Sequence, residues 1–282
     1  MYWQTSRRQI DLSRPLVMGI LNVTPDSFSD GGRYADPEAA LRRAEAMIAE
    51  GADIIDLGGE STRPGSQPVS AETEAERTIP IIEAIVKRFD TPISIDTSKS
   101  EVAGRAVDAG AEIINDISGL RFDANIARAA AGRNAGLILM HSRGEFGAMH
   151  SQPAVADIVA EVTAGLRRSV ETARSAGVAD DTIVLDIGIG FGKTLGQNLE
   201  LIAKLDRLVS EFEPYPILVG TSRKSFIGKT LDDAPPTERL GGSIASALAA
   251  IVNGASVVRV HDVRETVGAI KIAAAIAGEL NK

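Results

Sequence analysis

The chain has 282 residues, 44% of them hydrophobic, and a mean hydropathy of +0.04, which is typical of a folded globular protein. It contains no cysteine, which excludes disulfides, thiolate nucleophiles and cysteine-ligated zinc. Its net charge of -8 argues against broad binding to nucleic acid, although a small local anion site is compatible with it.

The opening segment, residues 1–15, has no apolar stretch of the signal-peptide kind, and later apolar runs are short and interrupted by glycine or charge. We therefore expect no membrane span and a cytoplasmic location. No linker or shift in composition divides the sequence, so we expect a single domain over residues 1–282.

Eight short runs of apolar and β-branched residues are bounded by turn-forming residues and predict strands. Their apolar residues are continuous rather than alternating, which is typical of strands buried on both faces of a parallel sheet. The predicted strands are Leu16–Asn22, Asp53–Gly58, Ile93–Asp96, Glu112–Asp116, Leu137–His141, Thr182–Asp186, Ile217–Gly220 and Ser256–His261.

Helical patterns lie between most of these strands. Asp36 and Pro37 suit the N-cap and first position of a helix that runs through Glu50. Four later segments either repeat apolar residues at three- and four-residue spacing or are rich in alanine. Helices are therefore expected over Val155–Ala176, Leu199–Phe212, Thr237–Asn253 and Glu265–Leu280.

One local pattern occurs three times, in Gly51–Asp56, Gly110–Asn115 and Gly254–Arg259. Each copy has a glycine that can end a helix, then a small residue, a β-branched pair and a polar residue. Alternation of helix and strand along the chain predicts the α/β class and a single (β/α)8 TIM barrel. A doubly wound open sheet is the alternative, because alternation alone does not require closure.

Polar residues stand at or just after the predicted strand ends, which meet at one face of such a barrel, where active sites lie. A single polar residue there can be an ordinary loop start, but charges inside apolar runs need partners. We therefore expect a site built from Asn22, Asp96, Asn115, Asp186, Lys224, Arg259 and His261.

The loops after the first two strands are also candidates. The loop Asn22–Gly32 is rich in hydroxyl groups, and Phe28 suits a residue that closes over a ligand. The glycines of Gly58–Gly65 allow close approach of the backbone, and Thr62 and Arg63 offer donors to an anion or an aromatic acid. A plain surface connector is the alternative for each loop.

The acceptors of Asp96 and Asp186, with the amide of Asn115, suit the edge of a 2-amino-4-oxo heterocycle such as a pterin. Ordinary strand-end hydrogen bonds are the alternative for any one of them. The segment Asp186–Thr194 does not match the glycine spacing of nucleotide-binding loops, and its Phe191 can face a planar ligand.

The last two strands carry basic side chains. Lys224 follows the seventh strand, and Arg259 and His261 end the eighth, where barrels often bind phosphate. These groups can make charge-assisted hydrogen bonds to phosphoryl oxygens, so an acidic chain can still hold a local anion. The histidines have no spacing typical of a zinc site.

Taken together, six segments resemble the signature segments of the dihydropteroate synthase family and occur in the same order. The resemblance implies a (β/α)8 barrel, usually a homodimer, that uses Mg²⁺. The implied reaction joins (7,8-dihydropterin-6-yl)methyl diphosphate to p-aminobenzoate, giving 7,8-dihydropteroate and diphosphate in folate biosynthesis. The segments are Met18–Asp30, Gly59–Gly65, Ser94–Ser98, Ile114–Asp116, Ser222–Ser225 and Arg259–Val263.

The resemblance also implies roles for single residues. Asn22 matches a position that contacts Mg²⁺ and diphosphate, and Arg259 and His261 match the diphosphate anchors. The expected catalytic residues are Lys224, Asp96, Arg259 and His261. The positions on the pterin side are Thr62, Asp96, Asn115, Asp186 and Lys224. Those on the p-aminobenzoate side, where sulfonamides compete, are Phe28, Pro64 and Ser225, with Arg63 in the same loop.

Two other functions are open at this point. A methyltransferase that moves a methyl group from methyltetrahydrofolate to a corrinoid would share the pterin-holding residues but would have no use for a diphosphate site. A non-catalytic paralogue is the second. Ile187 and the pair Ser142-Arg143 depart from the family pattern near the site. The small residues of Gly241-Gly242 and Ala245–Ala250 suggest the late helices as the dimer surface.

Overall fold

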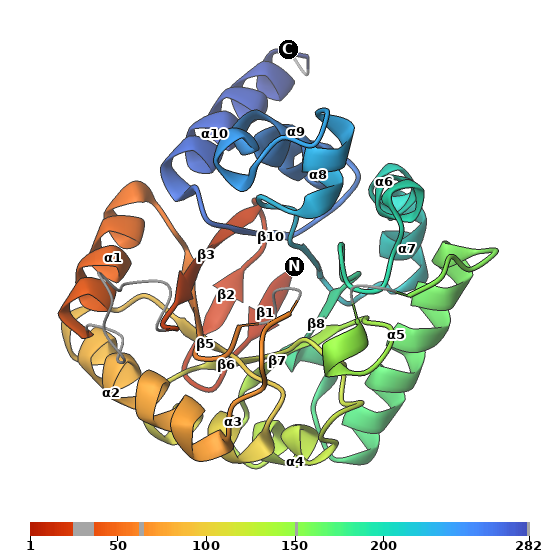
Figure 1. Ribbon diagram of the computed structural model, residues 1–282. Coiled ribbons are helices and arrows are strands. Elements are labelled where there is room, and N and C mark those ends of the chain that lie inside the picture. The colour runs from red at the N-terminus through yellow and green to blue at the C-terminus, as the bar shows by residue number, and fades with distance from the viewer. Residues whose placement is uncertain (25–36, 62–64, 150–151, 281–282) are drawn as a thin grey trace.

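The computed structural model describes residues 1–24, 37–61, 65–149 and 152–280. Eight parallel strands form a barrel enclosed by helices (Figure 1). The last strand pairs with the first, with Val257 opposite Leu16, so the sheet is closed and the open doubly wound alternative is wrong. The barrel strands are β3 (Leu16–Asn22), β4 (Ile54–Gly58), β5 (Ile93–Asp96), β6 (Ile113–Asp116), β7 (Gly136–Met140), β8 (Ile183–Asp186), β9 (Ile217–Val219) and β10 (Val257–Val260).

The predicted strands are confirmed to within about one residue at each end, but the helices are predicted less well. The expected helix over Leu199–Phe212 is two helices that meet at Lys204, where the backbone leaves the helical region. Within the described residues, no helix is long and apolar enough to cross a bilayer. The helices are α1 (Pro37–Glu50), α2 (Ala71–Arg88), α3 (Ser100–Asp108), α4 (Asn125–Ala131), α5 (Ile158–Ser175), α6 (Leu195–Ala203), α7 (Leu205–Glu211), α8 (Ser225–Thr230), α9 (Leu240–Val252) and α10 (Val263–Leu280).

The repeated glycine pattern marks three equivalent helix-to-strand turns. Gly51, Gly110 and Gly254 have φ values of +100°, +119° and +100°, in the left-handed region that disfavours residues with a Cβ. Each glycine follows a helix and leads within a few residues into a barrel strand. The three copies therefore place their last residues at equivalent levels of β4, β6 and β10.

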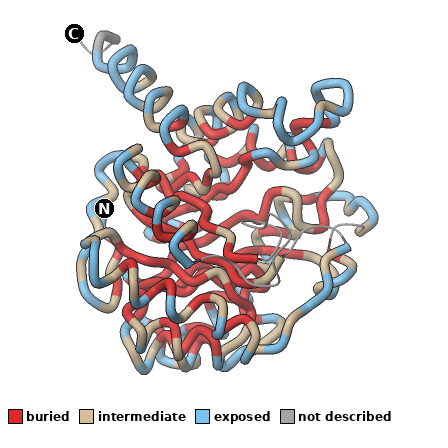
Figure 2. The backbone as a smooth tube through the Cα atoms, turned by 60° about the vertical axis from the view of Figure 1, so that its left-hand side comes forward, coloured by how far each residue is buried: buried red, intermediate tan, exposed pale blue. Residues whose placement is uncertain are grey.

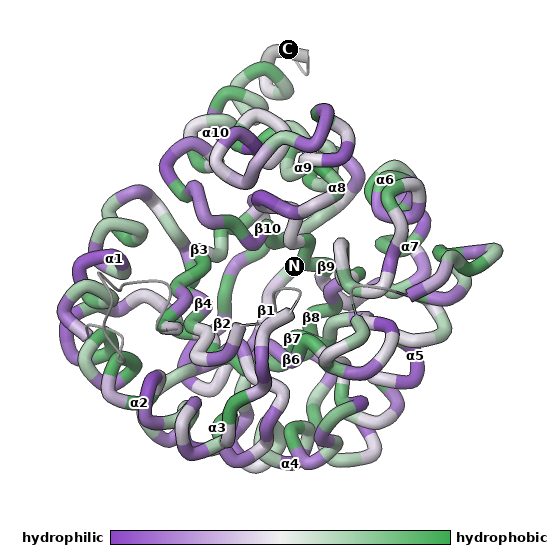
Figure 3. The backbone as a smooth tube through the Cα atoms, viewed as in Figure 1, coloured by the Kyte–Doolittle hydropathy of each residue, from purple (hydrophilic) through white to green (hydrophobic). Residues whose placement is uncertain are grey.

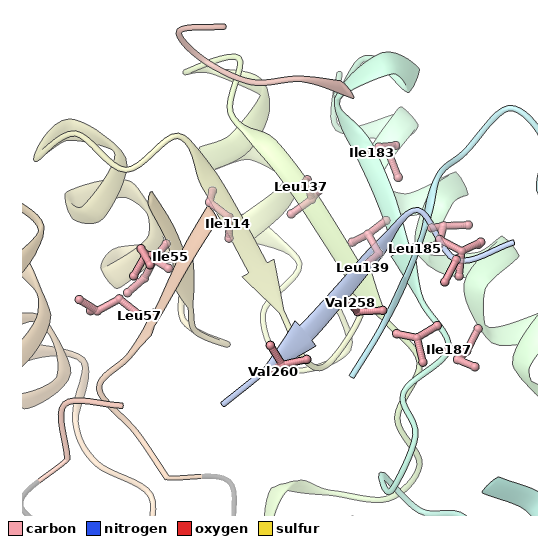
Figure 4. Close-up of a cluster of buried hydrophobic side chains, with 14 of the residues drawn as sticks. Ile55, Leu57, Ile114, Leu137, Leu139, Ile183, Leu185, Ile187, Val258 and Val260 are labelled. Carbon is pink, nitrogen blue, oxygen red and sulfur yellow. The ribbon is translucent and has the colours of Figure 1, made fainter. Parts of the chain in front are cut away.

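Each barrel strand has an inner and an outer face, because successive side chains of a strand point in opposite directions. One set, which includes Ile55, Ile114 and Val258, packs outward against the helices in a large apolar cluster (Figure 4). The alternate set, which includes Ile54, Ile113 and Val257, forms a second cluster inside the barrel. Figures 2 and 3 show this buried, apolar barrel wall within a ring of helices that are exposed and hydrophilic on their outer sides.

A short N-terminal hairpin closes the bottom of the barrel and was not predicted. Its strands β1 (Tyr2–Gln4) and β2 (Gln9–Asp11) pair antiparallel. Trp3 is fully buried in the inner cluster, and its indole N–H donates to the Thr182 carbonyl at 2.8 Å. The apolar floor leaves the opposite, C-terminal end of the barrel for polar groups.

Replacement of Trp3 by alanine is expected to lower the free energy of unfolding by about 3–5 kcal/mol, because it leaves a cavity and loses a buried hydrogen bond. Urea denaturation followed by circular dichroism measures this effect. Tyr2→Ala, at a 58% exposed position of the same strand, is the control and should change stability by less than about 0.5 kcal/mol. Equal effects of the two substitutions would contradict a plugging role for Trp3.

Candidate functional site

The upper half of the barrel interior is polar. The residues concerned alternate with the inner apolar set, so the same two-residue period that buries Ile54 and Ile113 also turns Asp56 and Asn115 inward. All six are buried or half-buried. The inward polar layer consists of Asn22, Asp56, Asp96, Asn115, Asp186 and Arg259.

Arg259 is the centre of this layer. Its Nε donates to Asp56 Oδ2 at 2.5 Å, and its Nη2 donates to Asp96 Oδ2 at 2.7 Å. Asn115 Nδ2 donates to the same Asp56 oxygen at 3.1 Å. Gly220 of the neighbouring loop lies against the Cβ of Arg259. The expected residues Asp96, Asn115 and Arg259 are thus brought together.

Asp56 was missed as a site residue. It is fully buried, holds both Arg259 and Asn115, and its second oxygen has no hydrogen-bond partner among the described residues. The three residues occupy the last position of the three glycine-led repeats. That shared position, inside buried strands, was the signal in the sequence that would have identified Asp56.

Asn22 lies beside Asp96 across a bare glycine. In the sheet register, Asn22 pairs with Gly58 and Gly58 pairs with Asp96. A Cβ on Gly58 would lie 3.5 Å from Asn22 Oδ1 and 3.7 Å from Asp96 Oδ2. Two hard oxygen ligands therefore point to the same space, which is the donor chemistry that Mg²⁺ prefers.

Within the described ranges, no group of three or more His, Cys, Asp or Glu residues could hold a metal by itself. Mg²⁺ commonly takes one or two oxygens from the protein and its other ligands from substrate phosphates and water. The residues present thus fit Mg²⁺ in that manner.

Asp186 and Lys224 form the opposite side of the polar layer. Asp186 Oδ1 accepts from the Gly188 N–H at 2.7 Å. Lys224 Nζ donates to the Ile189 carbonyl and lies 4.2 Å from the centroid of the Phe191 ring. The contact of Phe191 with a planar ligand stays a prediction, and its ring borders the site beside Lys224.

A buried lysine fixes the loop that carries these groups. Lys193 Nζ donates to the carbonyls of His141, Gly188 and Phe191 at 3.1, 2.7 and 3.1 Å. Gly188 has φ +67°, and a Cβ there would lie 1.8 Å from the His141 carbonyl oxygen, so only glycine fits. Lys193 was also missed; a lysine within a glycine-rich loop gave no distinct signal.

Burial and charge together shift the pKa values of the site. Burial raises the pKa of Asp96 to about 7 against the opposing effect of Arg259, and burial also raises the pKa of Asp186 against Lys224. Burial lowers the pKa of Lys224 to about 8, although Asp186 opposes this. Burial alone would lower the pKa of Arg259, but Asp56 and Asp96 outweigh it and the pKa is raised. Near neutral pH the site holds titratable groups of both signs.

The remaining predicted residues lie at the rim or outside the described ranges. His261 accepts or donates through Nδ1 to Ser222 Oγ at 3.1 Å, just beyond β10. Ser225 begins α8 directly after Lys224 and is exposed. Their predicted contacts with substrate remain predictions. Four residues predicted from the first two loops lie outside the described residues: Phe28, Thr62, Arg63 and Pro64.

Known proteins resemble the chain along nearly its whole length. Residues 18–261 match the family model described as pterin binding enzyme. The dihydropteroate synthase of Synechocystis sp. is 48% identical over 263 residues, which are 93% of this chain and 90% of that protein. The structure of Xanthomonas albilineans dihydropteroate synthase with 4-aminobenzoic acid is 42% identical, with a TM-score of 0.91 over 98% of each chain. That of the Burkholderia cenocepacia dihydropteroate synthase, complexed with 7,8-dihydropteroate, is 42% identical, with a TM-score of 0.89 over 99% of this chain and 98% of that one.

Proposed function

The chain belongs to the dihydropteroate synthase family, and we propose that it joins (7,8-dihydropterin-6-yl)methyl diphosphate to p-aminobenzoate. It is a transferase of folate biosynthesis. The observation that carries the assignment is the inward cluster in which Arg259 bridges Asp56 and Asp96 beside Asn115. This cluster supports the proposal because a cation suited to a diphosphate lies beside acceptors and an amide suited to the edge of a pterin.

The proposed steps follow from these groups. Asp96, Asn115 and Asp186 hold the polar edge of the pterin, and Thr62 is expected to join them. Arg259 and His261 stabilise the charge that develops on the diphosphate as its C–O bond to the exocyclic carbon breaks. The electron-rich pterin stabilises the resulting cation, and the p-aminobenzoate nitrogen captures it and then loses one N–H proton, which the released diphosphate can accept. No covalent nucleophile from the protein is required.

Mg²⁺ would be held by the side-chain oxygen of Asn22 together with the diphosphate, where it would neutralise phosphoryl charge. Asp96 lies beside Asn22 across Gly58 and borders the same space. We propose that Phe28, Arg63, Pro64, Phe191 and Ser225 form the p-aminobenzoate side of the site.

A direct assay tests the reaction. Purified protein with the dihydropterin diphosphate, p-aminobenzoate and Mg²⁺ is expected to release 7,8-dihydropteroate, and EDTA is expected to reduce the rate to the background level. Product is measured by chromatography, with added excess Mg²⁺ as the rescue control. Tight pterin binding without product would instead favour the corrinoid methyltransferase or the non-catalytic paralogue.

The likeness also supports a homodimer, and the exposed apolar side chains favour the last helices as its surface. Val252 at the end of α9 is 82% exposed, and Ile272 and Ile276 of α10 are 65% and 62% exposed. The last two are four residues apart and so lie on one face of α10. The small residues named from the sequence serve partly within the chain: Gly242 packs against Ile227, and Ala247 and Ala250 are buried.

The double substitution Ile272→Glu/Ile276→Glu is expected to convert the dimer to a monomer, because it places charge in an apolar contact. Sedimentation velocity measures the change in mass. Tyr2→Glu, at a 58% exposed position on the hairpin, should leave the dimer intact. A dimer that persists in the double variant would exclude this face of α10.

A further inference from the structure

A cavity lies outside the polar layer of the barrel, and its wall contains none of the residues proposed for the reaction. It has a volume of about 350 Å³, opens to solvent and is bordered by the loop after β6, the loop after β7 and one side of α5. Its wall includes Arg121, Arg143 and Arg168 but only one acidic residue, Glu161. The cavity therefore carries an excess of positive charge in a chain whose net charge is -8.

The floor of the cavity is a buried histidine. His141 is 6% exposed, and its Nδ1 has no hydrogen-bond partner among the described residues. A buried ring nitrogen without a partner is costly, so a ligand or water that pairs with it would be stabilising. The ring packs over Gly165 of α5, where a Cβ would lie 2.4 Å from His141 Cδ2. Because Gly165 has no side chain, the imidazole of His141 fits against the backbone of α5.

The arginines keep unused donors for a ligand. Arg121 uses Nη2 for Ser142 Oγ and the Gly144 carbonyl, and Arg143 uses Nη1 for the carbonyls of Pro153 and Gly192. Each guanidinium has five N–H donors, so others remain available. Across the described part of the chain, no hydrogen bond or ion pair holds the Arg168 guanidinium.

The electrostatic potential at the imidazole agrees with this arrangement. Burial, with smaller contributions from Lys193, Arg121, Arg143 and Arg168, lowers the pKa of His141 to about 2. The three arginines of the cavity wall thus act on one neutral ring. A potential that opposes protonation of a histidine attracts an anion to the same place.

We propose that this cavity, formed by His141, Arg121, Arg143 and Arg168, is a binding site for a small oxyanion with two negative charges, such as a phosphate group. Guanidinium groups bind the oxygens of such an anion in pairs, and the histidine supplies a further N–H. The size of the cavity allows either free phosphate or the phosphate end of a small metabolite. The cavity is adjacent to the reaction site, because the backbone N–H of His141 donates to the backbone carbonyl of Asp186 at 2.9 Å.

Isothermal titration of inorganic phosphate tests the proposal on the full chain. Arg168→Glu is expected to remove one equivalent of bound phosphate, or to weaken it by about tenfold or more, because it reverses a charge at an exposed position. Arg259→Met should leave this equivalent in place while removing any phosphate at the reaction site. Arg264→Glu, with a side chain 78% exposed on α10, is the matched control and should bind as the wild type does.

Two further measurements complete the test. Glycerol 3-phosphate in place of phosphate distinguishes the sources: tighter binding indicates a phosphorylated metabolite, and equal binding indicates phosphate alone. Arg168→Glu should retain wild-type condensation activity in phosphate-free buffer, so failure of this site is distinct from failure of the proposed reaction. Phosphate binding that Arg168→Glu leaves unchanged, or that Arg259→Met abolishes completely, would overturn the proposal.

Discussion

Arg259→Met is expected to lower kcat/KM by about 10²–10³-fold, because it removes the cation that faces the departing diphosphate. It also removes the partner of two carboxylates, Asp56 and Asp96, which Arg259 reaches at 2.5 and 2.7 Å. Leaving a buried charge without its partner costs about 3–5 kcal/mol of stability. Initial rates of product formation and urea denaturation measure the two effects separately.

A second variant separates lost chemistry from lost stability. In Arg259→Met/Asp56→Asn, a neutral amide replaces the fully buried carboxylate of Asp56, so much of the stability is expected to return while the rate stays low. Arg264→Met, at an exposed arginine, should change neither quantity. A double variant that regains both stability and activity would show that Arg259 acts only in folding.

The same substitution has a predictable dependence on pH. Arg259 lowers the pKa of Asp96, which burial raises to about 7, so without Arg259 this pKa rises further. A carboxyl whose native pKa lies above its unfolded value of 3.8 binds more protons in the folded state. The variant should therefore be most stable in mild acid and lose stability as the pH rises through neutrality.

The barrel was predictable because its strands are buried on both faces. Such strands read as unbroken apolar runs, and each of the eight runs found in the sequence is a strand of the closed sheet. No single run predicts that the sheet closes into a barrel, because closure depends on the pairing of β10 with β3, where Val257 lies opposite Leu16. The hairpin of Tyr2–Gln4 and Gln9–Asp11 has only three residues per strand, too few for a pattern.

The site was predictable to the extent that its residues stand inside apolar runs. Asp96, Asn115 and Asp186 meet this condition, and the structure turns all three inward. Asp56 meets it as well and stands at the last position of a glycine-led repeat, but the sequence does not show that its carboxylate contacts Arg259. Contacts between side chains from strands far apart in the chain depend on barrel register, which single-sequence patterns do not contain.

Lys224→Ala is expected to reduce kcat by about 10²-fold or more with little change in fold, because it removes the cation that faces Asp186. Lys224→Arg gives the sharper test. The lowered pKa of Lys224, about 8, predicts that wild-type kcat/KM declines as the lysine loses its proton above that pH. Arginine remains protonated, so the alkaline decline should move upward by more than one pH unit.

The acid side of the profile provides the internal control. Ionised Asp96 is needed to accept from the pterin, and its pKa of about 7 predicts a decline in kcat/KM below that pH in both wild type and Lys224→Arg. Lys229→Arg, at an exposed position of α8, the helix that begins directly after Lys224, should have the wild-type profile. If the alkaline decline stays near pH 8 in Lys224→Arg, a different group titrates there, and the charge of Lys224 is not what the reaction requires.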